Sequence, residues 1–211
     1  MNRRALLRSA ALVSLATLFT APLVTAEKAA APPLNVEELL FDPAAPTGGN
    51  PKGDVTIVTF FDYNCGYCKK ASPALEKLVT EDGNIRLVYK DWPILSETSV
   101  VGAQMALAAK YQGKYEAAHN ALMGVRGGLS SSNMGAALKQ AGVDVARLSA
   151  DLKSKAPEIG ALLKRNLDQA NALELQGTPV YLIGPYKVAA ALDYEAFKGV
   201  VRDARERAKA N

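Results

Sequence analysis

The 211-residue sequence contains one histidine and two cysteines, and this scarcity excludes several classes of site. A single histidine, His119, disfavours catalytic machinery of the Ser-His-Asp or Cys-His type. Two cysteines and one histidine cannot complete a four-ligand zinc site. The sequence also lacks a cluster of lysine and arginine with interleaved aromatic residues, the pattern typical of nucleic-acid surfaces. We therefore expect no resident metal, no cofactor and no nucleic-acid partner.

Hydrophobic residues make up 49% of the chain and charged residues 22%, which is the balance of an ordinary globular protein. The pI near 9.0 and the formal net charge of +4 depend on three arginines near the N-terminus, Arg3, Arg4 and Arg8. Without that segment the chain is nearly neutral. The charge is therefore a property of the N-terminus, and the length suits one domain or slightly more.

The first 26 residues have the pattern of an export signal. A basic start is followed by an apolar stretch around Ala10–Phe19, a helix-breaking Pro22 and small residues up to Ala26. This pattern predicts a signal peptide cleaved near Ala26 and a periplasmic location, by the general or the twin-arginine route. An uncleaved membrane anchor is the alternative, because the uncharged stretch Ser9–Ala26 just reaches the length of a bilayer span. Export would place the cysteines in an oxidising compartment, where disulfides persist.

Residues 27–53, rich in alanine, proline and glycine, are predicted to be a linker or short N-terminal segment, with one short helix over Asn35–Phe41, before a domain over residues 54–207. Within the domain, β-branched and aromatic runs predict strands, and 3.6-residue periodicity predicts helices. A helical block over about residues 96–176 is too long for a simple crossover. We therefore expect an α/β core with an inserted helical subdomain. The predicted core strands are Val55–Tyr63, Ile85–Lys90, Val180–Ile183 and Tyr186–Ala190, and helices follow Cys68 and span Tyr194–Lys209.

Cys65-Gly66-Tyr67-Cys68 lies where the first core strand meets the first helix, and this context favours redox exchange. An ordinary thiol, with a pKa of about 8.5, is only a few per cent thiolate at neutral pH. Unpaired N–H groups and the helix dipole favour the anion at a helix N-terminus. Cys65 sits in the first turn, so we expect it to be the more exposed, attacking thiol. Cys68, one turn later, is expected to be buried and to resolve the mixed disulfide.

Two other interpretations of the cysteine pair remain open. One is a non-catalytic binding domain with a fixed structural disulfide, although a four-residue ring constrains the unfolded chain by only about 2 kcal/mol. The other is a copper(I)-binding or copper-tolerance module, because two thiolates suit a soft metal ion.

The segment 58–70, VTFFDYNCGYCKK, together with the later run 177–180, GTPV, resembles the DsbA-type thioredoxin-fold oxidoreductases of bacterial envelopes. The resemblance covers about residues 50–205 and implies a thioredoxin-like core with a helical insertion. It also implies a nucleophilic Cys65, a resolving Cys68 and a cis peptide bond before Pro179. The Thr178 backbone would then face Cys65 and bind an extended substrate chain by strand-like hydrogen bonds. The predicted substrate-binding residues are Thr178 and Pro179, together with Gly66 and Tyr67, which lie between the two cysteines.

The direction of exchange depends on two departures from the family pattern. Tyr67 carries no charge where DsbA has a histidine, which predicts that the Cys65–Cys68 pair is less oxidising than that of DsbA. The dipeptide Gly66-Tyr67 also resembles the one between the cysteines of the DsbC isomerases. Thr59 stands where many relatives have a buried glutamate that relays a proton to the resolving cysteine. We expect reduced or misoxidised exported proteins as substrates, and a DsbB-like or DsbD-like membrane partner. Residues 27–53 are too short for the isomerases' dimerisation domain, which favours a monomer.

Overall fold

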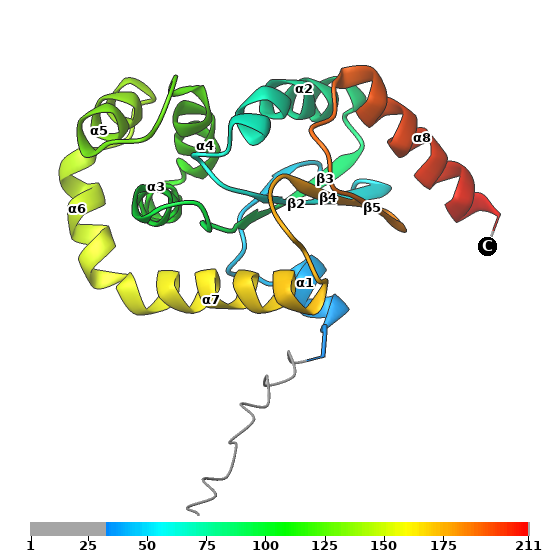
Figure 1. The fold of residues 1–211 in the computed structure, drawn as a ribbon, viewed down its shortest axis with the longest axis horizontal. Helices are drawn as coiled ribbons and strands as arrows, with labels where there is room; N and C mark the ends of the chain where they lie inside the picture. The colour runs from blue at the N-terminus through cyan, green and yellow to red at the C-terminus, as the bar shows by residue number, and fades with distance from the viewer. Residues whose placement is uncertain (1–32, 211) are drawn as a thin grey trace, which may run out of the picture. The chain divides into compact units, whose positions relative to one another are not determined.

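The computed structural model describes residues 33–210, so the predicted signal peptide and its cleavage near Ala26 lie outside the described residues. A five-stranded mixed sheet in the order β1-β3-β2-β4-β5 forms the centre of this part of the chain (Figure 1). Strands β2 and β3 are parallel, and the other neighbouring strands pair antiparallel. The strands are β1 (Thr47–Gly49), β2 (Val55–Phe61), β3 (Ile85–Asp91), β4 (Val180–Ile183) and β5 (Tyr186–Val188).

Strand β2 occupies the middle of the sheet because nearly every residue in it is apolar. Ile57, Val58 and Phe60 have no exposed surface, and both faces of the strand are covered. Burying a side chain of this size contributes about 1.5–3 kcal/mol. The register sets Thr59 of β2 opposite Tyr89 of β3 and Tyr181 of β4. The chain leaves the carboxyl end of this strand directly into the cysteine motif.

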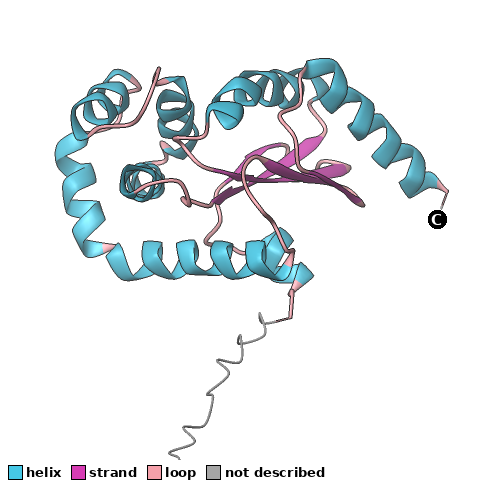
Figure 2. Ribbon diagram, in the orientation of Figure 1, coloured by secondary structure: helices cyan, strands magenta, loops and turns pink. Residues whose placement is uncertain are grey.

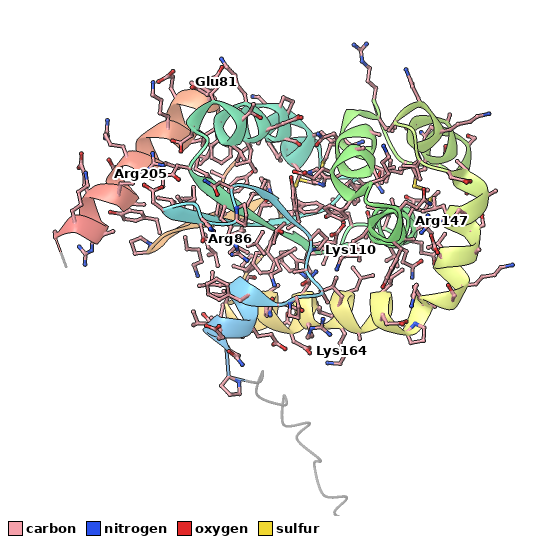
Figure 3. All side chains as sticks on the ribbon, turned by 180° about the vertical axis from the view of Figure 1, so that it is seen from behind. Glu81, Arg86, Lys110, Arg147, Lys164 and Arg205 are labelled. Carbon is pink, nitrogen blue, oxygen red and sulfur yellow. The ribbon has the colours of Figure 1, made fainter. Side chains whose placement is uncertain are left out.

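Helices cover both faces of the sheet (Figure 2). Helices α2 (Gly66–Asp82) and α8 (Tyr194–Lys209) lie on one face, and α1 (Val36–Phe41) and α7 (Ala156–Ala172) lie on the other. Helix α2 ends where Gly83 adopts a left-handed conformation, with φ of 68°, which a residue without Cβ adopts at little cost. The C-terminal helix is joined to this face by Arg205, visible in Figure 3, which bonds carboxylates before β2 and at the end of α2.

Five α-helices separate β3 from β4. Four of them lie beside the sheet, and α7 returns along its lower face in Figure 1. Local caps start several of them: the hydroxyl of Ser130 accepts the N–H of Asn133 in a capping box, and the Asp144 carboxylate accepts the N–H of Arg147. The predicted α/β core with a helical insertion is confirmed. The four beside the sheet are α3 (Glu97–Ala109), α4 (Tyr115–Gly124), α5 (Ser131–Gln140) and α6 (Val145–Ser154), with a 3₁₀ turn, η1 (Lys110–Gln112), after α3.

Residues 33–53 contain more structure than a linker. The predicted short helix is confirmed as α1, with Asn35 as its N-cap, and the segment adds an edge strand that was not predicted, β1, which pairs antiparallel with β3. The guanidinium of Arg86 in β3 donates to the Leu40 carbonyl at 2.8 Å and ties α1 to the sheet. A three-residue strand with two glycines has no alternating pattern, so its position depends on the free edge of β3. Within residues 33–210, no helix combines the length and apolar content needed to cross a bilayer.

Candidate active site

Cys65 is held at the start of α2 by a tightly bonded turn. Its N–H donates to the Asp62 carbonyl at 3.0 Å, and the buried Asp62 carboxylate accepts three backbone N–H groups. Cys65 is the N-cap of the helix, where its sulfur accepts the Cys68 N–H at 3.2 Å. The three donors to Asp62 belong to Asn64, Ile94 and Leu95. The sulfur therefore sits at the positive end of α2, as the sequence predicts.

The surroundings of Cys65 favour its thiolate. A hydrogen bond from the Cys68 thiol, together with the Thr178 side chain and the N–H groups of Cys68 and Tyr67, lowers the pKa of Cys65 to about 6, against the opposing effect of burial. At neutral pH most of the protein carries an anion at this position. A thiolate of this kind is a nucleophile toward disulfides.

Cys68 has the opposite character. The shared proton with Cys65 and burial both raise its pKa, so it remains a thiol beside a thiolate. Both cysteines are free in this structure, which corresponds to the reduced protein. The pair thus combines one ionised sulfur with one protonated sulfur, the arrangement required for attack followed by resolution.

The Thr178–Pro179 peptide bond is cis, as the family resemblance implies. The loop that contains it brings the Thr178 carbonyl to 3.2 Å from Cys65 Sγ, and the thiol donates to this carbonyl when it is protonated. These residues are 113 positions apart in the sequence. The structure therefore places the cysteines, Thr178 and Pro179 at one location.

An open groove of about 660 Å³ begins beside the cysteines. Tyr67 is 69% exposed and lines it together with Thr178 and Pro179. Most of the other residues that line the groove are small or apolar and lie between Leu175 and Ala191. Three ionisable side chains, Lys70, Glu174 and Lys187, also line it. A long, partly apolar groove of this kind fits an extended polypeptide better than a compact small molecule.

Cys65 is more exposed than Cys68, as predicted, but the difference is small, 5% against 2%. The Thr178 carbonyl lies against the Cys65 sulfur and limits its exposure. Lys69, at the start of α2, donates from Nζ to the carbonyls of Val125 and Gly127, at 2.7 Å each. Lys69 thereby fastens the loop after α4 to the active-site helix.

A buried polar cluster next to the cysteines was not predicted. The ring of His119, in α4, is buried against Phe61 and Tyr89, and its Nδ1 lies 3.1 Å from the Tyr63 hydroxyl. The carboxylate of Asp91 accepts the Tyr115 hydroxyl at 2.6 Å. The sequence offers one signal for this cluster, an aspartate at the end of an otherwise apolar strand. Within residues 33–210, no group of three or more histidine, cysteine or acidic side chains could hold a metal ion.

Known proteins share this architecture. Residues 42–203 match the family model described as "Thioredoxin". A thioredoxin-like oxidoreductase from Silicibacter pomeroyi DSS-3 is 41% identical, with a TM-score of 0.77 over 82% of this chain and 99% of that one. The thiol-disulfide exchange protein alpha-DsbA2 from Wolbachia pipientis is 28% identical, with a TM-score of 0.75 over 79% of this chain and 90% of that one.

Curated sequences also match. The Na(+)/H(+) antiporter NhaA 1 of Salinispora arenicola is 26% identical over 158 residues, which is 74% of this chain. The chain spans about a quarter of the length of that relative, 24%. The family model, the fold and the Cys65–Cys68 pair together show that the chain belongs to the thioredoxin family and shares the architecture of the DsbA-type thiol-disulfide oxidoreductases.

Proposed function

We propose that this protein exchanges disulfides with exported proteins in the bacterial envelope, with Cys65 as nucleophile and Cys68 as resolving thiol. The observation that supports this best is the position of Cys65 Sγ, which carries a stabilised negative charge and lies beside the Thr178 backbone at the head of the groove. The N-terminal sequence pattern supports export.

The exchange proceeds in two steps. The Cys65 thiolate attacks one sulfur of a substrate disulfide; that S–S bond breaks, and the second substrate sulfur leaves as a thiolate. Cys68 then loses its proton and attacks Cys65, which releases the first substrate sulfur and forms the Cys65–Cys68 disulfide. In the reverse direction, this disulfide oxidises a pair of substrate thiols.

The groove supplies the substrate contacts in this proposal. An extended segment on either side of the substrate cysteine would lie along Tyr67 and Pro179 and form strand-like hydrogen bonds with the Thr178 backbone. Gly66 lies in open space next to Cys65, since a Cβ added there would meet nothing within 4 Å. Pairing through the backbone makes the interaction tolerant of substrate sequence, as a general exchange catalyst requires.

Reduction of insulin and reactivation of scrambled ribonuclease test the proposal. We expect the purified protein to catalyse both, and Cys65→Ala to abolish both while the protein stays folded. A Cys65→Ala protein with full activity would contradict the proposal. A copper(I) titration addresses the metal-binding alternative, which requires a tight complex with both thiolates.

The direction of exchange can be read from the thiol state of the protein in cells. Rapid alkylation of free thiols traps that state. An oxidised pair supports an oxidase served by a DsbB-like partner, and a reduced pair supports an isomerase or reductase served by a DsbD-like partner. Loss of the trapped state on deletion of the corresponding membrane protein identifies the partner class.

A further inference from the structure

The resolving thiol has no carboxylate beside it to take its proton. Thr59 is the residue of β2 that faces Cys68 across a small cavity, and its hydroxyl cannot act as a base at neutral pH. The Asp62 carboxylate, close in sequence, is occupied by three backbone N–H groups. Cys68 is 2% exposed, so its proton has little direct contact with bulk water. The proton must leave by another route.

The small cavity leads from Cys68 to His119. It has about 10 Å³ for the centre of a water-sized sphere, which is room for about one molecule of water. Thr59 and Ser72, which carry hydroxyl groups, also line it. A water molecule in this cavity would lie between Cys68 and His119, because both residues line it.

Beyond the imidazole, polar groups continue toward a buried acid. His119 Nδ1 lies 3.1 Å from the Tyr63 hydroxyl. Burial and the nearby Asp91 carboxyl group raise the pKa of Tyr63, but no hydrogen bond joins Tyr63 to Asp91 among residues 33–210, so a proton passes between them only after a small rotation of the Tyr63 hydroxyl or ring. One Asp91 oxygen accepts the Tyr115 hydroxyl, and the other, Oδ1, has no hydrogen-bond partner among residues 33–210. The unpartnered oxygen can accept a proton.

We propose that His119 and Tyr63 relay to Asp91 the proton that the resolving thiol gives up. The inference rests on the proposed thiol-disulfide exchange and adds to it the route of this proton. The Cys68 proton passes to the cavity water, which gives one of its own protons to His119 Nε2. Nδ1–H passes its proton to the Tyr63 oxygen, and the Tyr63 hydroxyl proton goes to the Asp91 carboxylate. The net change is a Cys68 thiolate and a protonated Asp91.

The electrons follow the exchange already described. The thiolate attacks Cys65 Sγ, the Cys65–substrate bond breaks, and its electron pair leaves with the substrate sulfur. When a substrate thiolate later opens the Cys65–Cys68 disulfide, Cys68 leaves as a thiolate and Asp91 returns the proton by the same path. Asp91 thus stores a proton between the two directions of reaction.

The pKa shifts of Asp91 and His119 suit the roles of these residues in the relay. Burial raises the pKa of Asp91 to about 7, so that it exchanges a proton readily near neutrality. Burial lowers the pKa of His119 to about 3, which keeps the ring neutral and lets it pass a proton without holding the charge. Other titratable groups also face the relay. They are Tyr89 from β3, Tyr115 and the surface residue Glu116 from α4, and Tyr181 from β4. Helix α7 contributes the uncharged side chain of Asn166.

Reaction with dithiobis(nitrobenzoic acid) separates the two thiols. Attack by Cys65 releases one coloured thiolate, and resolution by Cys68 releases a second. In stopped-flow measurements, with reagent raised until the first release is the faster, we expect His119→Phe and Tyr63→Phe to leave the first release unchanged. Both variants should slow the second by about 10- to 100-fold. Each keeps an aromatic ring in the cluster, and Tyr63→Phe removes a single oxygen atom.

A pH profile distinguishes a relay from a packing effect. The second release in the wild-type protein should rise with pH through about 7, where Asp91 becomes a carboxylate, and Asp91→Asn should remove this rise. Met123→Leu is the matched control, because Met123 lines the same cavity and carries no exchangeable proton. A second release within twofold of wild type in both phenylalanine variants refutes the relay, as does equal slowing in the control. A wild-type protein that releases no coloured thiolate refutes the proposed function itself.

Discussion

Removing the Thr178 hydroxyl should raise the pKa of Cys65 from about 6 to about 7. The Thr178 side chain is one of the groups that lower this pKa, after the Cys68 thiol. Its buried hydroxyl has no hydrogen-bond partner among residues 33–210, so it is free to turn toward the ionised sulfur. A Thr178→Val substitution keeps the shape of the side chain and the carbonyl that faces the sulfur. It removes only the hydroxyl, so the change in pKa measures that contact.

The magnitude follows from the contacts of the thiolate. A fall in pKa from 9.0 to about 6 corresponds to about 4 kcal/mol of stabilisation of the anion. A hydrogen bond to a charged group contributes about 1.5–3 kcal/mol, and partial screening by solvent reduces it. The hydroxyl is therefore expected to supply about one third of the total, close to 1.4 kcal/mol, which is tenfold in the ionisation constant.

Thiolate absorbance in the far ultraviolet, followed against pH in the reduced protein, measures this pKa. Cys65→Ala identifies the signal, because the transition near pH 6 should vanish in that variant. A transition that stays at the same pH in Thr178→Val would refute the contribution of the hydroxyl. A wild-type transition at the pH of an ordinary thiol would refute the whole account of the site.

The same contacts predict how stability varies with pH. The pKa of Cys65 is lower in the folded, reduced protein than in the unfolded chain, so the stabilisation is complete above about pH 9 and is lost as the pH falls through 6. Urea unfolding of the reduced protein should therefore show a decline of about 2–4 kcal/mol across this window, relative to Cys65→Ala. A decline of the same size in Cys65→Ala would assign the effect to other groups.

Three further predictions concern the framework around the site. Asn64→Ala should lower the free energy of unfolding by about 2 kcal/mol, seen as a lower urea midpoint, because this side chain bonds three hydroxyls at the start of α3 and the N–H before α5. Lys69→Met should speed amide hydrogen exchange in the loop after α4, which Lys69 Nζ fastens to α2; unchanged exchange would contradict that role. Arg205→Met should cost about 1 kcal/mol at low salt, and less at about 1 M salt, because its ion pairs with Asp54 and Asp82 are partly exposed; a salt-independent loss would contradict the ionic explanation.

The predictable part of the site is the part encoded locally. Cys65 caps α2 because a strand ends and a helix begins within a few residues, and periodicity reveals both. Most element boundaries agree with the structure within two or three residues, and α8 agrees at both ends. The same reasoning did not identify β1, whose three residues pair only because β3 offers a free edge.

Proximity across long stretches of sequence explains what could not be predicted. The exposure of Cys65 depends on the Thr178 loop. The position of the Lys69 ammonium group depends on backbone carbonyls 56 and 58 residues away in the sequence. The partner of Asp91 comes from α4. The amine of the adjacent Lys90, whose side chain points to the opposite face of the sheet, has no hydrogen-bond partner among residues 33–210.

The sequence alone determined the chemical type of this protein, because two sulfurs three residues apart at the start of a helix have few other uses. It also determined the layered core, through the apolar character of β2 and the helical periodicity around it. Only the tertiary structure decided which groups surround the two sulfurs, how little of Cys65 meets solvent, and which buried acid stands at the end of a polar path from Cys68. Those features depend on side chains from separate elements meeting in a closely packed interior, and no local pattern specifies such meetings.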